Sequence, residues 1–178
     1  MCGFLYIQQV ESFKTSDQNI FDKGLELLEY RGPDNRSSLL LKNQYFGHVR
    51  LAIQDISEGS NQPVDDEYST LLYNGEIYNF KDFQGHFPSD TLFLKDYLKK
   101  NQDLSCLNGM FSALEVRKQS NDVTLYRDFY GEKPLYYFQS NEILIISSTI
   151  KSIIFILKSY KKICLAYNQN AIEDYLMF

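Results

Sequence analysis

Short apolar segments separated by turns dominate this sequence and limit the folds open to the chain. In its second half they follow one another without an intervening helix, at residues 111–117, 123–128, 135–138 and 143–147. Similar segments occur earlier, at residues 3–10, 38–42, 45–53 and 69–73. Helices are predicted at residues 18–30, 91–100, 150–158 and 169–177. Strands and helices thus occur in blocks rather than in strict alternation, which predicts an α+β fold with mostly antiparallel sheets.

Local signals set the expected ends of these elements. The Gly32–Pro33 pair ends the first helix, and Ser89–Asp90 is a typical N-cap for the helix at 91–100. Residues 59–63 are expected to form a loop. Asn74–Gly75 is a strong turn signal, so we expect the strand at 69–73 to end there.

Size and charge exclude several classes of protein. A length of 178 residues favours one domain. The net charge of −5, without a basic stripe, argues against a general nucleic-acid binder or a protein of anionic membrane surfaces. The start of the chain lacks the charged and apolar regions of a signal peptide, and the apolar run at 153–157 is too short to span a bilayer. We therefore expect a cytoplasmic location.

The cysteines and histidines are few and widely spaced. An odd set of three, Cys2, Cys106 and Cys164, is neither a disulfide framework nor a CxxC metal site. With only His48 and His86 beside them, a zinc cluster is not expected. Cys106 and Cys164 are expected to be buried, inert thiols.

Cys2 directly follows the initiator methionine, and small second residues permit removal of that methionine. Removal leaves one residue with both a thiol and an α-amine, whose unperturbed pKa values are about 8.5 and about 7.7–8.0. The amine can then act as general base for its own thiol, directly or through a water. Taken alone, a small residue at position 2 is more simply incidental.

Cys2 is accompanied by motifs that follow one another along the whole chain. They are Met1–Phe4, Arg31–Asp34, Gly47–Ile53, Gln62–Pro63, Asn74–Asn79, Ser89–Thr91, and Arg127–Asp128 followed by Gly131–Tyr137. In this order and spacing the chain resembles the class II glutamine amidotransferase domain of the glutamine-hydrolysing asparagine synthetase family, which is an N-terminal nucleophile hydrolase. Arg31–Asp34 and Gly131–Tyr137 favour the asparagine synthetase branch over relatives that make amino sugars or begin purine synthesis.

The resemblance implies a four-layer αββα N-terminal-nucleophile hydrolase fold, with two antiparallel sheets between helical layers. It implies a glutamine amidotransferase type 2 domain at residues 2–160. Residues 161–178 would begin the connection to a synthetase domain absent from this chain. The last helix ends on Tyr175–Phe178 without a glycine cap or a polar tail, which is typical of a helix covered by further chain or by another domain.

The reaction implied by the resemblance is hydrolysis of L-glutamine to L-glutamate and ammonia through a Cys2 thioester. The ammonia would pass to an ATP-pyrophosphatase synthetase domain, in the same full-length chain or in a separate subunit. No metal or organic cofactor is expected for the glutaminase domain, and ATP and magnesium are implied only for the synthetase domain. Neither a nucleic acid nor a membrane is an expected partner, and the resemblance allows a homodimer.

Three alternatives remain open at this point. The domain could be a catalytically silent glutamine-binding or regulatory module. It could be an amidotransferase that supplies ammonia to an acceptor other than aspartate. It could also be an amidase or acylase of the same nucleophile class that accepts another amide.

The resemblance assigns the catalytic roles to three residues. Cys2 is the nucleophile, while the Asn74 side-chain amide and the Gly75 backbone N–H form an oxyanion hole for the charge that develops on the attacked carbonyl oxygen. Without the family match, a hairpin turn would fully explain Asn74 and Gly75.

The resemblance also assigns the residues that bind glutamine, together with Asn74 and Gly75. Arg50 would bind the α-carboxylate through two hydrogen bonds, with Leu51 and Ile53 contributing from the neighbouring backbone. Asp90 and Glu76 would hold the α-ammonium. The alternatives are a surface ion pair for Arg50, a helix cap for Asp90 and a turn charge for Glu76.

Other motif residues are expected to be structural. Arg31–Asp34 ends a helix and is expected to buttress the glutamine-binding loop. His48 is expected to be a packed core histidine rather than a base, because Cys2 supplies its own. Tyr136 and Tyr137 are expected to be core aromatics.

Overall fold

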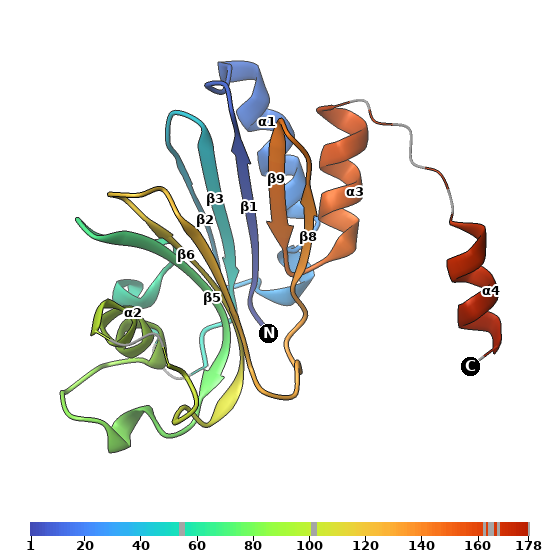
Figure 1. The fold of residues 1–178 in the computed structure, drawn as a ribbon. Helices are drawn as coiled ribbons and strands as arrows, with labels where there is room; N and C mark the ends of the chain where they lie inside the picture. The colour runs from blue at the N-terminus through green and yellow to red at the C-terminus, as the bar shows by residue number, and fades with distance from the viewer. Residues whose placement is uncertain (54–55, 101–102, 162, 164–165, 167, 178) are drawn as a thin grey trace.

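The computed structural model describes residues 1–178 except 54–55, 101–102, 162, 164–165, 167 and 178. Its described strands form two antiparallel sheets (Figure 1). The strands of the larger sheet are β1 (Gly3–Gln9), β2 (Asn35–Leu40), β3 (Gln44–Arg50), β8 (Tyr136–Gln139) and β9 (Ile143–Ser147). Their order is β2-β3-β1-β9-β8. The smaller sheet contains β4 (Val64–Asp65), β5 (Ser69–Ile77), β6 (Gly109–Arg117) and β7 (Val123–Arg127), in sequence order.

The described α-helices are α1 (Thr15–Glu26), α2 (Asp90–Lys100), α3 (Ile150–Ser159) and α4 (Gln169–Met177), with short 3-10 helices at Glu29–Arg31, Glu58–Ser60 and Phe80–Asp82. The first three cover the outer faces of the sheets. Helices α1 and α3 lie on the larger sheet and α2 lies on the smaller one (Figure 1). None of the described helices is long and apolar enough to cross a membrane.

The side chains of β1 illustrate how the layers are held together. Leu5 and Ile7 pack in the cluster formed with α1 and α3. Phe4 and Tyr6 point to the opposite face and pack against residues of the smaller sheet, since successive side chains of a strand alternate between faces. A third apolar cluster lies between the smaller sheet and α2. These three interfaces confirm the predicted αββα arrangement.

The turn predicted at Asn74–Gly75 is wrong. Strand β5 continues through both residues to Ile77 and pairs along its whole length with β6. The ladder of hydrogen bonds with β6 outweighs the local turn preference. Gly75 instead allows close approach of the two strands, because a Cβ atom at this position would lie 2.2 Å from the Met110 carbonyl oxygen.

Two predictions about side-chain burial are also wrong. Tyr136 and Tyr137 are 39% and 67% exposed rather than core residues, because β8 is an edge strand of the larger sheet. Cys106 is exposed in the loop before β6, and Cys164 lies outside the described residues. His48 is fully buried as predicted, with Nε2 3.2 Å from the Tyr73 carbonyl oxygen. Burial lowers the pKa of His48 to about 3.

Other predicted boundaries differ by a few residues. Helix α1 begins at Thr15, three residues before the expected start, and β2 begins at Asn35. Helix α4 lies apart from the two sheets and has no buried residue (Figure 1). The division of the chain at residues 160–161 stays a prediction.

Candidate active site

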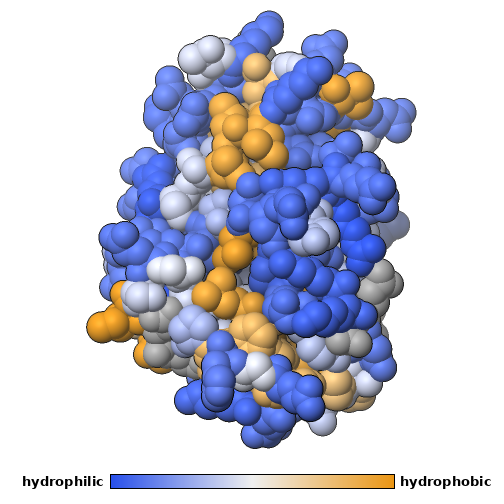
Figure 2. All heavy atoms as spheres, turned by 90° about the vertical axis from the view of Figure 1, so that its left-hand side faces the viewer, coloured by the Kyte–Doolittle hydropathy of each residue, from blue (hydrophilic) through white to orange (hydrophobic). Residues whose placement is uncertain are grey.

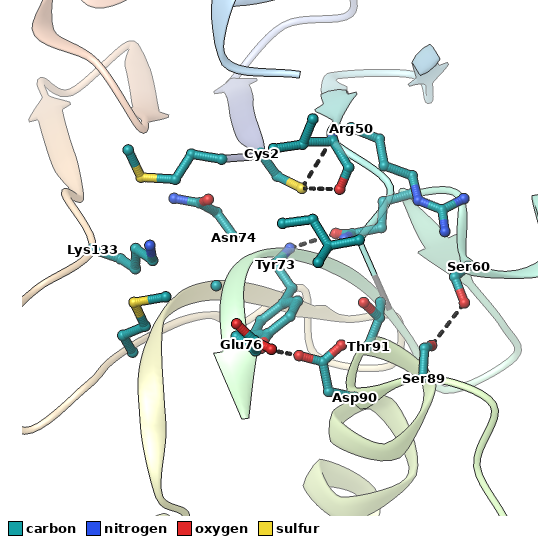
Figure 3. A pocket seen from close by; sticks show the side chains of 16 residues that line it. Cys2, Arg50, Ser60, Tyr73, Asn74, Glu76, Ser89, Asp90, Thr91 and Lys133 are labelled. Atoms are coloured by element: carbon teal, nitrogen blue, oxygen red, sulfur yellow. Dashed lines mark hydrogen bonds between the residues drawn. The ribbon is translucent and has the colours of Figure 1, made fainter. Parts of the chain in front are cut away.

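A pocket opens where the start of β1, the end of β3, the middle of β5 and the start of α2 meet (Figure 3). Its cavity has a volume of about 120 Å³. All residues predicted for the site line this pocket: Cys2, Arg50, Leu51, Ile53, Asn74, Gly75, Glu76 and Asp90. The fold thus brings together residues from both sheets and one helix, although their individual roles stay predictions.

The Cys2 thiol lies where the larger sheet borders the pocket, directly before β1. The Leu51 N–H donates a hydrogen bond to Cys2 Sγ over 3.4 Å, and Arg31 Nε donates to the Cys2 carbonyl oxygen over 2.9 Å. Burial raises the pKa of the Cys2 thiol, against the opposing effects of the Leu51 hydrogen bond, the positive N-terminus and Arg50. The thiol is therefore mostly protonated at neutral pH and needs a base before it can attack.

The Arg31–Asp34 segment, which was predicted to buttress the glutamine-binding loop, contacts both Cys2 and the backbone around Arg50. Besides the contact from Arg31, Asp34 Oδ2 accepts a hydrogen bond from the Ala52 N–H over 2.8 Å. The Asp34 N–H donates to the Arg50 carbonyl oxygen over 3.0 Å. Met1 is 53% exposed at the mouth of the pocket, and β1 begins only at Gly3. Its removal thus requires no change in the core.

Asn74 is the most unusual side chain of the pocket. It is fully buried, yet neither its Oδ1 nor its Nδ2 has a hydrogen-bond partner among the described residues. Leaving such a group unpaired costs about 1–3 kcal/mol, so an orphaned amide in a native fold calls for an explanation such as a ligand. A reacting amide held beside Cys2 is one ligand that could pair with it.

Figure 3 shows the Arg50 side chain to the right of Cys2, with Asn74 to the left. Its guanidinium is held by two hydrogen bonds of 2.7 Å that Nη1 donates, to the Ser57 carbonyl oxygen and to Asn61 Oδ1. The residue is only 7% exposed, which argues against an ordinary surface ion pair. A guanidinium held in this way can bind a carboxylate with a defined geometry.

Two carboxylates, Asp90 and Glu76, line the pocket below Tyr73 in Figure 3. Asp90 Oδ2 accepts hydrogen bonds from the Tyr73 hydroxyl over 2.7 Å and from the Ile77 N–H over 3.0 Å. Burial raises the pKa of Asp90, and the negative charge of Glu76 raises it further. The hydrogen bonds from Tyr73 and Ile77 act in the opposite direction. Ser89 Oγ accepts the hydrogen bond from the Leu92 N–H that caps α2. Asp90 is therefore more than a cap and, with Glu76, makes this end of the pocket suitable for a cation.

Sequence reasoning missed several residues of the pocket. Gln62 Oε1 accepts a hydrogen bond of 2.6 Å from the Tyr73 N–H, which links the loop before β4 to β5. The Ser60 and Ser89 hydroxyls form a buried hydrogen bond of 2.7 Å. Lys133 enters from the loop between β7 and β8. Gln62 and Lys133 belong to motifs recognised in the sequence, whereas nothing local distinguishes Tyr73 or Ser60.

Among the described residues, no group of three or more His, Cys, Asp or Glu side chains could hold a metal ion. The expectation that the site needs no cofactor stays a prediction.

Comparison with known families decides what kind of domain contains this pocket. The family model of the glutamine amidotransferase domain matches residues 1–178. The chain belongs to the glutamine amidotransferase domain family. This amidotransferase domain is 31% identical over 169 residues to asparagine synthetase [glutamine-hydrolyzing] 3 of Bacillus subtilis, covering 86% of the chain and 27% of that protein.

Other relatives are named as asparagine synthetases or as amidases. Asparagine synthetase [glutamine-hydrolyzing] 1 of Bacillus subtilis is 35% identical over 170 residues, covering 86% of the amidotransferase chain and 26% of that protein. An amidase of Gibberella zeae is 31% identical over 159 residues, covering 82% of the chain and 22% of that protein. The chain thus spans about a quarter of the length of these relatives.

Solved structures of low sequence identity share the fold of the amidotransferase domain. A glutamine phosphoribosylpyrophosphate amidotransferase from B. subtilis superposes with a TM-score of 0.66 at 18% identity, covering 87% of this chain and 43% of that chain. An allosteric regulatory enzyme of purine biosynthesis gives a TM-score of 0.68 at 17% identity, with the same coverage. These matches confirm the predicted fold class.

Proposed function

We propose that this domain hydrolyses L-glutamine to L-glutamate and ammonia, with Cys2 as the nucleophile after Met1 has been removed. The observation that carries the proposal is the orphaned amide of Asn74 in the same pocket as the Cys2 thiol. An unpaired donor next to a nucleophile is suited to the oxygen of a carbonyl under attack.

The two ends of the pocket match the two ends of glutamine. Arg50 binds the α-carboxylate, with Leu51 and Ile53 contributing from the adjoining backbone. Asp90 and Glu76 bind the α-ammonium, whose positive charge offsets the raised pKa of Asp90. The side-chain amide of the substrate then extends toward Cys2 and Asn74.

The reaction follows from this orientation. The free α-amine of processed Cys2 takes the thiol proton, directly or through a water, and the sulfur attacks the amide carbon of glutamine. Asn74 and the Gly75 N–H stabilise the oxyanion. The intermediate collapses to a thioester as the amine donates its proton to the departing ammonia, and water then hydrolyses the thioester to give glutamate and free Cys2.

The proposal extends to the use of the ammonia. Relatives named as glutamine-hydrolysing asparagine synthetases are about four times longer than the matched segment, which favours delivery to an ATP-dependent synthetase domain, with aspartate as the acceptor. A reducing, cytoplasmic setting belongs to the same proposal, because the mechanism needs Cys2 as a free thiol.

The test is glutamate release from L-glutamine by protein shown by intact mass to lack Met1. We expect release that is abolished by Cys2→Ala and retained in the matched control Cys106→Ala, whose thiol is exposed in another loop. Glutamine binding without glutamate release would instead identify a regulatory module. Preferential cleavage of N-acylated or peptide amides would identify an amidase, a name that two of the relatives carry.

A further inference from the structure

Lys133 lies in a loop whose backbone is fixed from two sides. Asp128 Oδ2 accepts a hydrogen bond of 3.0 Å from the Lys133 N–H, and Asp128 Oδ1 accepts one of 2.8 Å from the Glu132 N–H. Arg127 Nε donates to the Lys133 carbonyl oxygen over 3.0 Å. The side chain of Lys133 thus enters the pocket from a defined position (Figure 3).

Lys133 is mostly buried, but its ammonium is not paired with any described residue. The residue is only 6% exposed, yet Nζ makes no hydrogen bond or ion pair with any described residue. Buried lysines are normally paired, because taking an uncompensated charge out of water is costly. Unlike the sealed amide of Asn74, the Lys133 ammonium is not enclosed by the protein and borders the open space of the pocket that contains Cys2.

The charges around the start of the chain show what this ammonium can act on. Burial lowers the pKa of the Met1 amine, which precedes Cys2 by one residue, and the positive charges of Arg31 and Lys133 act in the same direction, whereas Cys2 and Asp34 oppose them. The Cys2 thiol faces Arg50, which favours the thiolate, and Asp90, which disfavours it. Lys133 differs from Arg31 and Arg50, since both of these donate hydrogen bonds to described partners.

We propose that Lys133 is a positioning residue whose unpaired ammonium favours the deprotonated forms of both the amine and the thiol of processed Cys2. A nearby cation repels the protonated amine and attracts the thiolate, so one charge acts on both groups in the same direction. Lys133 itself transfers no proton and forms no bond. The inference rests on the proposed function in taking Cys2, freed of Met1, as the working nucleophile.

The test measures the alkylation rate of Cys2 by iodoacetamide as a function of pH. It uses protein without Met1 in which Cys106 and Cys164 are replaced by serine, so that Cys2 is the only thiol. Lys133→Met is expected to raise the pH midpoint of alkylation by about one unit. At any pH below the midpoint, the alkylation rate of this variant should then be about tenfold lower than that of the unchanged protein. Lys133→Arg is expected to restore the midpoint, and the exposed control Lys151→Met to leave it unchanged.

Glutamine kinetics give a second readout. The kcat of Lys133→Met is expected to fall at pH 7 and to recover at higher pH, with little change in KM. A purely structural role would lower activity without moving the alkylation midpoint, and that outcome overturns the inference. An equal loss in Lys133→Arg, with the midpoint raised, would also overturn it.

The two readouts separate this inference from the proposed function. Alkylation requires no glutamine, so the midpoint tests Lys133 even in protein that releases no glutamate. Lys133→Gln serves as a second neutral variant if the methionine variant does not fold. An unshifted midpoint in the folded neutral variant refutes the role of Lys133, whereas a shifted midpoint without glutaminase activity refutes only the proposed function.

Discussion

Replacing Asn74 by leucine tests whether the pocket is built at the expense of stability. Leucine places two methyl groups where the asparagine has its amide oxygen and nitrogen, both of which are buried and unpaired. Because each unpaired group costs about 1–3 kcal/mol and apolar replacement removes that cost, we expect Asn74→Leu to raise the free energy of unfolding by about 1–2 kcal/mol. For a domain of this size the melting temperature should rise by about 2–8 °C.

The same substitution should have the opposite effect on activity. Loss of one oxyanion donor raises the reaction barrier by about 2.7–4 kcal/mol, which lowers kcat by about 10²–10³-fold. The KM for glutamine should change little, because the variant retains Arg50 for the α-carboxylate and Asp90 and Glu76 for the α-ammonium. A more stable protein with a much lower kcat is the expected outcome.

Urea unfolding and glutamate release, measured on the same protein preparations, provide the assay. A matched control is Asn79→Leu, because both amide atoms of Asn79 are paired: Nδ2 donates to the Cys106 carbonyl oxygen and Oδ1 accepts from the Asn108 N–H. This control should lose about 1–2 kcal/mol of stability and keep its kcat. If Asn74→Leu is destabilised as much as the control, the Asn74 amide is satisfied in the folded protein and the reasoning is refuted.

Three further predictions concern residues that hold the backbone around the pocket. Gly75→Ala should destabilise the fold by about 1–3 kcal/mol, seen as a lower urea midpoint, because its Cβ would meet the Met110 carbonyl oxygen; an unchanged midpoint would contradict the close approach of β5 and β6. Burial alone would raise the pKa of Asp128, but hydrogen bonds from backbone N–H groups outweigh it and lower that pKa. Its stabilising contribution is therefore fully present above about pH 4 and lost as the pH falls through the lowered folded-state value. Asp128→Asn should flatten urea midpoints between pH 5 and pH 2, and parallel curves would refute this. Arg31→Met should lower kcat by about tenfold or more through displacement of Cys2, with a small change in the melting temperature; an unchanged kcat would argue against this contact.

Through its family resemblance, the sequence was sufficient to predict the layers of the fold and eight of the residues that line the pocket, but not how one central segment is paired. Asn74–Gly75 is a local turn signal, and pairing with the distant strand β6 keeps both residues within β5. The motif match grouped them with other residues of the pocket that they line, whereas the local pattern predicted a turn in place of the observed strand. Pairing between distant strands is invisible to local propensity.

The burial of individual side chains was the other property that residue type alone could not predict. Tyr136 and Tyr137 are apolar enough for a core but lie on an edge strand, whose exposure depends on the order of strands in the sheet. Lys133 was recognised only as a member of the Gly131–Tyr137 motif, and no place in the pocket was predicted for it. Its position in the pocket follows from the loop that Asp128 holds, which no periodicity in the sequence reveals.

Strand β1 has neighbours that are made at very different times on the ribosome. It pairs with β3 on one side and β9 on the other, and the Phe4 N–H donates to Ser148 Oγ, 144 positions further along the chain. At about 5–20 residues per second, roughly 7–30 s separate the synthesis of these two residues. During this interval the first residues cannot be enclosed by β9, and an aminopeptidase meets an open chain end. In the proposed function, Met1 can thus be removed from the nascent chain before β9 pairs with β1 and completes the larger sheet around Cys2.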